Sequence, residues 1–177
     1  TPGGQIELAG GYLMAGEIDR AVQLLEALPE TQDDAGLRRD TLLLTALLRQ
    51  GKTDDAVRRA EAMVERNPDS IESRNLAAAV YASAGRTDQA RAQLEAILGL
   101  QPDNLGAQIS LGRLDLAGGK LDAAARRFEA VLEKDPKNLI AQLGMSAVAI
   151  ERRDPKEAER WLLKARDDHP QSAEARL

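Results

Sequence analysis

Apolar residues recur along this chain with a period of 34 residues. When the positions of each period are numbered as places 1 to 34, a small residue falls at place 20 and apolar residues fall at places 24 and 27. Place 20 is Ala56, Ala90, Ala124 and Ala158; place 24 is Ala60, Leu94, Phe128 and Leu162; place 27 is Met63, Ile97, Val131 and Ala165. Such a stripe predicts amphipathic helices that pack closely through small side chains.

Prolines with the same spacing mark the ends of these helices. They are Pro68, Pro102, Pro136 and Pro170, and each is followed two residues later by Ser or Asn. Proline stops a helix because it lacks the backbone N–H, whereas Ser and Asn can accept a hydrogen bond from the first turn of the next one. The pattern therefore predicts that one helix ends and another begins at each proline.

A second set of breaks lies half a period earlier. Gly51, Gly85 and Gly119 are each followed three residues later by Asp, as expected for a left-handed turn before a new helix. In the last period Asp154, Pro155 and Glu157 predict a helix start with a capping box. Each period is therefore expected to form two helices joined as a hairpin.

These breaks divide the chain into repeats 37–70, 71–104, 105–138 and 139–172, with 173–177 opening another. An earlier repeat, 2–35, follows the same pattern but needs one inserted residue between Pro29 and Gly36. The repeats resemble the tetratricopeptide (TPR) family, which has Ala at places 20 and 27 and Pro at place 32. The resemblance implies an all-α, right-handed solenoid of about five stacked hairpins over 1–177. The family's aromatic residue at place 4 is absent from every repeat.

Composition and charge argue against several classes of function. Hydrophobic residues make up 43% of the chain, and the net charge of −5 arises from acidic and basic residues that are interspersed. The sequence has no basic stripe that could bind a phosphate backbone, so we do not expect a nucleic acid as a partner. There is no cysteine, one histidine and no phosphate-cradling glycine loop, so we expect no enzyme activity, no metal and no cofactor. No apolar run is long enough for membrane insertion.

The resemblance implies a concave groove lined by the first helix of each hairpin, which would bind a protein or peptide. Carried over place by place, the candidate groove residues are Arg38, Thr41, Thr45, Arg49, Asn75, Ile109, Arg113, Leu116, Leu143 and Ile150. The set lacks the lysines with which some TPR adaptors hold carboxylates, and its members from Ile109 onward are apolar except for Arg113. We therefore expect an apolar or amphipathic partner segment, with Arg113 and Asn75 orienting it. Alternatively, the apolar members pack against neighbouring repeats.

Two further alternatives concern the whole assembly. The chain reads as an excised part of a larger protein, and uncapped apolar faces at both ends would favour end-to-end self-association. Its arginine-rich composition resembles that of bacterial multi-repeat envelope proteins of exopolysaccharide export and PEP-CTERM sorting. This resemblance implies a periplasmic location rather than a cytoplasmic one. In that setting the array could be a structural spacer without a groove ligand. A pentatricopeptide-like RNA-binding array is disfavoured by the acidic charge.

Overall fold

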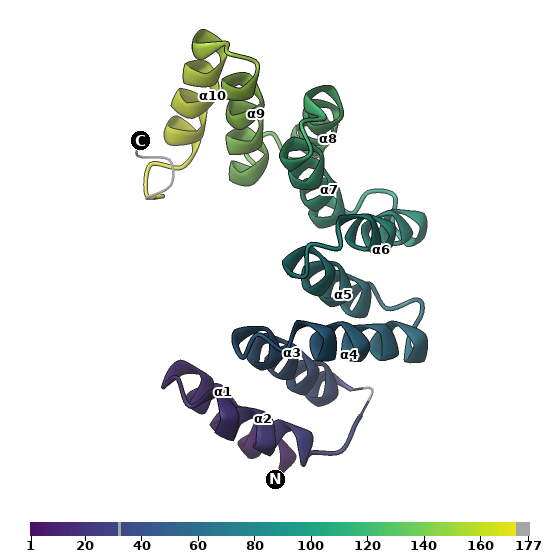
Figure 1. Ribbon diagram of the computed structural model, residues 1–177. Helices are drawn as coiled ribbons and strands as arrows, with labels where there is room; N and C mark the ends of the chain where they lie inside the picture. Colours follow the sequence, from purple (N-terminus) through teal and green to yellow (C-terminus); the bar gives the residue numbers. More distant parts are fainter. Residues whose placement is uncertain (32, 173–177) are drawn as a thin grey trace. The chain divides into compact units, whose positions relative to one another are not determined.

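The computed structural model describes residues 1–31 and 33–172, and all regular structure in these ranges is helical. The helices are α1 (Pro2–Met14), α2 (Ile18–Glu26), α3 (Asp34–Arg49), α4 (Thr53–Arg66), α5 (Ile71–Ser83), α6 (Thr87–Leu100), α7 (Leu105–Ala117), α8 (Leu121–Lys134), α9 (Leu139–Glu151) and α10 (Pro155–Asp168). Each predicted repeat contains one pair of consecutive helices (Figure 1). The expected further repeat at 173–177 lies outside the described residues.

The predicted caps form where the proline pattern places them. The side chains of Ser70, Asn104 and Asn138 accept hydrogen bonds from the backbone N–H three residues later, at 3.1, 2.9 and 3.1 Å. Helix α3 is different, because it starts at Asp34, before the predicted repeat boundary, with Asp33 as its cap at 2.9 Å. The inserted residue of the first repeat thus lies in the longer connection that precedes α3.

The capping box predicted at α10 forms only in part. The Asp154 side chain accepts from the Glu157 backbone N–H at 3.1 Å, as expected. The Glu157 carboxylate, however, does not reach back to the Asp154 backbone N–H, which donates to the Ala149 carbonyl at 2.9 Å. Glu157 instead accepts from the indole N–H of Trp161 at 2.9 Å, because one helical turn separates the two side chains.

Four of the five hairpin turns contain a glycine with positive φ. Gly16, Gly51, Gly85 and Gly119 have φ values of 79°, 73°, 70° and 70°. The equivalent residue of the last hairpin is Arg153, with φ of 58°. Arg153 has a Cβ and yet adopts the left-handed backbone conformation, which only glycine adopts without steric cost. The turn geometry is therefore maintained in the last repeat at the expense of local strain.

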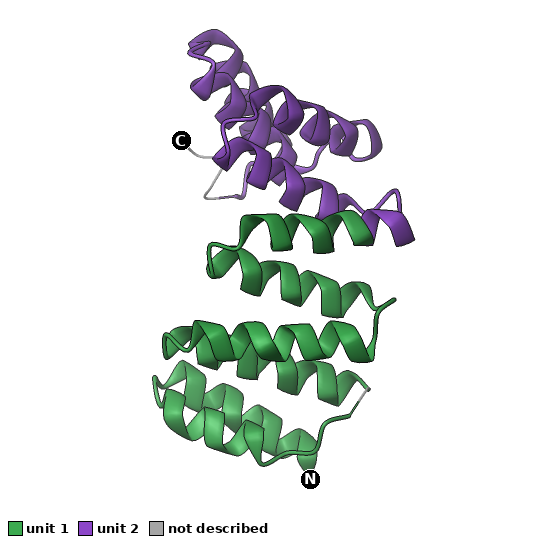
Figure 2. Cartoon of the chain, turned by 45° about the vertical axis from the view of Figure 1, so that its right-hand side comes forward, with its two compact units in different colours: residues 1–96 green, residues 97–177 purple. Residues whose placement is uncertain are grey.

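The described chain divides into two compact units, Thr1–Ala96 and Ile97–Leu177 (Figure 2). In unit 1, α3 packs against α1, α2, α4 and α5. In unit 2, α9 packs against α7, α8 and α10. Within each unit a first helix therefore contacts both its own hairpin partner and the preceding hairpin.

The core of unit 2 is built around Phe128, whose side chain is 1% exposed. Its ring lies between Gly112 of α7 and Gly144 of α9. A Cβ added at Gly112 would lie 2.9 Å from the ring, and one added at Gly144 would lie 2.6 Å from it. Both distances are below van der Waals contact, so the two glycines provide the space that the aromatic ring fills.

Replacing Arg153 with Gly should stabilise the protein by about 0.5 to 1 kcal/mol, because it removes the left-handed strain of a side-chain-bearing residue. Thermal melting followed by circular dichroism measures the change. The matched control is Gly119→Ala, which introduces the same strain at the equivalent turn and should lower stability by about 1 kcal/mol. An unchanged or lower melting temperature for R153G would contradict the strain at this turn.

Replacing Gly144 with Ala should destabilise the protein by about 1 to 3 kcal/mol, because the new methyl overlaps the enclosed Phe128 ring. Chemical denaturation measures the loss. Gly10→Ala serves as the control, since its Cβ would meet only a Leu42 methyl at 3.9 Å and its helix should gain about 0.5 to 1 kcal/mol. Equal effects of the two substitutions would refute the role of Gly144 in seating the ring.

Candidate partner-binding surfaces

The predicted binding residues of unit 1 are polar side chains on α3 and α5. Arg38, Thr45, Arg49 and Asn75 are exposed, and Thr41 is half-buried. Three of them already make intramolecular hydrogen bonds. Thr41 and Thr45 donate to backbone carbonyls one turn earlier, both at 2.8 Å, and Arg49 donates to the Leu13 carbonyl at 3.0 Å. Arg38 and Asn75 are thus the members of this set best placed to meet a partner.

The predicted residues of unit 2 divide between the core and the surface. Ile109 is 9% exposed and belongs to the core cluster with residues of α8 and α9, and Leu116 packs against the same cluster. Ile109 is therefore almost fully buried, whereas Leu116 is half-buried and keeps part of its surface exposed. Arg113 and Ile150 are exposed, and Leu143 is half-buried.

Helix α9 carries apolar side chains on two sides. One side is buried and includes Ala141, Met145 and Val148. The other is a stripe that we call the α9 stripe, formed by Ile140, Leu143, Ala147 and Ile150. Ile140 is 42% and Ile150 is 57% exposed, while Leu143 and Ala147 are half-buried. Spacings of three and four residues keep these side chains on one helix face. An apolar face that is left in contact with water is typical of a docking surface.

A cavity of about 300 Å³ in unit 1 was not anticipated from the sequence. It is bordered by the starts of α3 and α5 and by the end of α4. Its charged lining consists of Asp33, Asp34, Asp40, Glu72 and Arg66. Four carboxylates against one guanidinium give the cavity an acidic lining, although Asp33 caps α3 and Asp40 is engaged in ion pairs.

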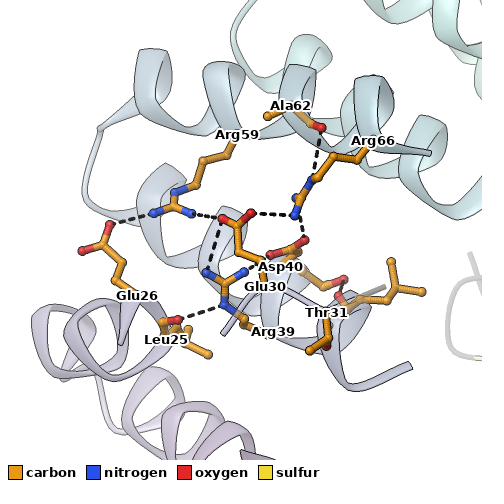
Figure 3. A network of polar contacts seen from close by, with 12 residues as sticks. Leu25, Glu26, Glu30, Thr31, Arg39, Asp40, Arg59, Ala62 and Arg66 are labelled. Carbon is orange, nitrogen blue, oxygen red and sulfur yellow. Dashed lines mark hydrogen bonds and ion pairs between the residues drawn. The ribbon is translucent and has the colours of Figure 1, made fainter. Parts of the chain in front are cut away.

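An ion-pair network adjoins this cavity, and two of its members, Asp40 and Arg66, line the cavity. Figure 3 shows the network. The buried Arg39 side chain donates to the Leu25 carbonyl at 3.0 Å and to Asp40 at 2.7 Å. Arg66 reaches both Glu30, at 2.7 Å, and Asp40, at 3.4 Å. The network joins the connection after α2 to α3 and α4. Because Arg39 is 2% exposed, its guanidinium needs these acceptors, and the network is a structural element of the fold.

Burial raises the pKa of Asp40 above its ordinary value, and the nearby Arg39 and Arg66 guanidinium groups oppose this shift. Glu30 adds to the upward shift through repulsion between carboxylates. The desolvation effect dominates because the carboxyl group lies among side chains of α3 and α4. Asp40 therefore acts as a counter-charge held inside the protein, and its acceptor oxygens are taken up by the network.

Comparison with known proteins identifies the repeat. The tetratricopeptide repeat profile matches residues 47–114 and 115–177, which together make up most of the chain. The chain belongs to the tetratricopeptide repeat family. No curated protein matches it significantly in sequence.

Solved TPR structures share the fold. A tetratricopeptide repeat protein from Parabacteroides merdae is 22% identical, with a TM-score of 0.76, over 97% of this chain and 68% of that one. A thermophilic TPR protein from Thermus thermophilus is 18% identical, with a TM-score of 0.75, over 99% and 95% of the two chains. YrrB, described as a TPR protein with an unusual peptide-binding site, is 19% identical, with a TM-score of 0.65, over 97% and 88%.

This TPR chain replaces the family's large residue at place 4 with polar side chains that bond to their own hairpin. The place-4 residues are Asp40, Arg74, Gln108 and Gln142. Each contacts the second helix of its hairpin: Asp40 meets Arg66, Arg74 donates to Gln93, Gln108 accepts from Arg127, and Gln142 donates to Asp168. The recurrence of a polar residue at place 4 is the sequence signal that could have predicted this polar seam.

The single histidine lies at the end of α10. The His169 Nε2 atom is 2.5 Å from the Lys137 carbonyl oxygen. Among residues 1–31 and 33–172, no cluster of histidine and acidic side chains is arranged to hold a metal ion. Within the same ranges no helix is both long and apolar enough to cross a bilayer. The resemblance to envelope arrays stays a prediction.

Asp168 should make the stability of the protein depend on pH. Hydrogen bonds from Lys164 and Gln142 hold the pKa of Asp168 below its ordinary value of 3.8. A lowered folded-state pKa stabilises the fold above pH 3.8, and this contribution is lost as the pH falls through the folded-state pKa. Asp168→Asn should therefore melt at a lower temperature than wild type at neutral pH, and the gap should close in acid.

The control for this prediction is Asp167→Asn. Asp167 is an exposed neighbour that forms an ion pair with Arg166, and surface pairs of this kind contribute little to stability. Melting curves across the acidic range would compare the three proteins. A gap between wild type and D168N that persists unchanged below pH 3.8 would contradict the electrostatic role of Asp168.

Proposed function

We propose that this TPR chain is a protein-interaction scaffold that binds an apolar or amphipathic segment of a partner protein along the α9 stripe. The observation that carries the proposal is that α9 is apolar on the side that faces water as well as on the side that faces the core. A helix that is apolar on all sides is normally buried on all sides. A partner segment would complete that burial.

The energetics of the α9 stripe favour such a partner. Ile140 and Ile150 are about half exposed, so each still has apolar area to remove from water. Fully burying an Ile side chain contributes about 1.5 to 3 kcal/mol, and the half-buried Leu143 would add a part of that. A partner helix with apolar residues three and four positions apart would match the spacing of the stripe.

Polar groups near the stripe would set the orientation of the segment. Arg113 is exposed on α7, at place 9, the place that Ala147 occupies on the adjacent first helix. A guanidinium there would favour a partner with a carboxylate beside its apolar face.

The family supports this function in its general form. TPR arrays bind proteins and peptides, and one of the structural neighbours is described as having a peptide-binding site. The α9 stripe is apolar and none of the candidate binding residues is a lysine, so the proposed ligand differs from an acidic C-terminal peptide.

The proposal predicts that peptides selected by the immobilised protein from a displayed random library carry apolar residues at helical spacing. Binding of those peptides should fall by about tenfold or more in the double variant Leu143→Glu, Ala147→Glu, because each carboxylate would be desolvated against an apolar ligand. Fluorescence anisotropy with labelled peptides measures the affinity. Circular dichroism verifies that the variant remains helical.

The matched control places two glutamates on a second helix, away from every predicted binding residue. Gln89 and Ala92 of α6 are exposed and lie three residues apart. The variant Gln89→Glu, Ala92→Glu should bind the selected peptides as wild type does. Peptides that bind the α9 variant with undiminished affinity would contradict the proposal, as would a failure to select any peptide.

A further inference from the structure

The acidic cavity of unit 1 contains polar groups that the fold leaves without partners. This cavity, which we call the α3–α5 cavity, has a volume of about 300 Å³ and lies at the starts of α3 and α5. Two of its lining residues, Asn67 and Ser73, differ from the equivalent residues of other repeats in how their side chains are bonded. Both differences leave hydrogen-bonding capacity that a ligand could use.

Ser73 occupies place 3, which is a buried alanine in both later repeats. Ala107 and Ala141 are 0% exposed, and Ser73 is 4% exposed. The Ser73 backbone N–H donates to the Ser70 cap, but within the described residues the Ser73 hydroxyl forms no hydrogen bond. This hydroxyl oxygen is not sealed inside the core either. Because Ser73 lines the α3–α5 cavity, its hydroxyl is open to that cavity and can bond only to what occupies it.

Asn67 occupies place 31, where the side chains of the next two repeats bond within their own loops. Gln101 and Asp135 each accept a hydrogen bond from the asparagine three residues later, both at 3.1 Å. The residue three positions after Asn67 is Ser70, whose hydroxyl donates to Glu72 instead, at 3.1 Å. The half-buried Asn67 carboxamide therefore has no hydrogen-bond partner within residues 1–31 and 33–172. Its carbonyl oxygen is free to accept from a ligand.

The charges around the cavity favour a cation. Asp33 and Asp40 are engaged in the α3 cap and the ion-pair network, and the Arg66 guanidinium is bound to Asp40. The exposed Asp34 forms no ion pair with another described residue, and Glu72 accepts only the hydroxyl of the α5 cap. Two carboxylates are thus available, and carboxylates can only accept hydrogen bonds. A ligand that satisfies them must be a donor, and a positively charged donor binds them most strongly.

The cavity also has an apolar wall. Leu37 and Met63 line it beside the polar groups. Lysine and arginine side chains combine an aliphatic stem with a head that carries only donors, so they match both parts of this lining. The volume of about 300 Å³ is at the lower end of the range for ligand pockets, as expected for a site that takes one side chain.

We propose that the α3–α5 cavity binds a lysine or arginine side chain of a partner protein. The cationic head donates to Asp34 and Glu72 and to the free oxygens of Asn67 and Ser73, while the aliphatic stem packs against the apolar wall. This site lies in unit 1 and recognises charge, whereas the α9 stripe lies in unit 2 and recognises apolar residues. It therefore goes beyond the proposed function and does not depend on it.

Backbone amide NMR tests the proposal with small probes. The probes are the Nα-acetyl N-methylamides of lysine, arginine and norleucine, which carry these side chains between two peptide groups. The lysine or the arginine probe should cause saturable shifts at amides that border the cavity, such as those of Asp34, Ser70 and Glu72. The norleucine probe has a similar stem without the charge and should bind at least tenfold more weakly.

A charge-neutralising variant and a matched control locate the site. Asp34→Asn, Glu72→Gln removes the two available carboxylates and should weaken binding of the cationic probe by about tenfold or more. Asp88→Asn, Glu95→Gln removes the same charge from exposed residues of α6, including one in its first turn, and should bind as wild type does.

Ser73→Ala tests the buried hydroxyl separately. Alanine is the residue at this place in α7 and α9, so the variant should melt no lower than wild type. It should nevertheless bind the cationic probe about fivefold more weakly, because one hydrogen bond to the head is lost. Circular dichroism verifies the helicity of every variant. If D34N, E72Q were to lose helicity, S73A alone decides the test.

Four results would overturn the proposal. They are an absence of saturable shifts at the cavity, equal binding of the norleucine probe, wild-type affinity in D34N, E72Q or S73A, and binding of n-butylammonium without binding of the lysine or arginine probe. The last result would indicate a site for a free amine, since the cavity would then exclude the flanking peptide groups. The α9-stripe variant L143E, A147E should bind the cationic probe as wild type does, so failure at one surface is distinguished from failure at the other.

Discussion

Burial of one helix face under the first helix of the next hairpin is the constraint on which this structure depends. A single amphipathic hairpin cannot cover its own apolar side, so it is stable only when another hairpin covers it. In unit 2 this contact is centred on Phe128, which fits because Gly112 and Gly144 leave room on both sides. The first helices contribute places 3, 7 and 10 to the contact, and the preceding hairpin contributes an apolar seat.

The same constraint determines which side of a first helix stays exposed to solvent. In α9, the side with Met145 is buried in the core and the α9 stripe remains open to solvent. Polar residues at place 4 hold α3, α5, α7 and α9 to their own second helices, where the family pattern has a large side chain. The chain thereby retains the TPR hairpin with few aromatic residues. Its surfaces differ accordingly between the polar first helices of unit 1 and the apolar α9.

Much of the fold could be predicted because its signals are local. Prolines, caps and turn glycines act within a few residues of themselves, and Ser70, Asn104 and Gly119 do what their positions predicted. The burial of Ile109 could not be predicted from its place, because an apolar residue that packs in the core and one that contacts a ligand look alike in sequence. The Arg39–Asp40 network could not be predicted either, because it depends on contacts between residues far apart in the sequence. Nor could the left-handed conformation of Arg153, because arginine does not favour positive φ.

The central claim is that a hairpin is stabilised by burying its apolar face under the first helix of the next hairpin. Truncating the residue at the centre of that contact in unit 2 tests the claim most directly. Phe128→Ala should lower the free energy of unfolding by about 3 to 5 kcal/mol in chemical denaturation, because it opens a cavity in the core of unit 2. Met14→Ala shortens a side chain that is 91% exposed and should change this free energy by less than about 0.5 kcal/mol. A Phe128 variant that is as stable as the Met14 variant would contradict the account.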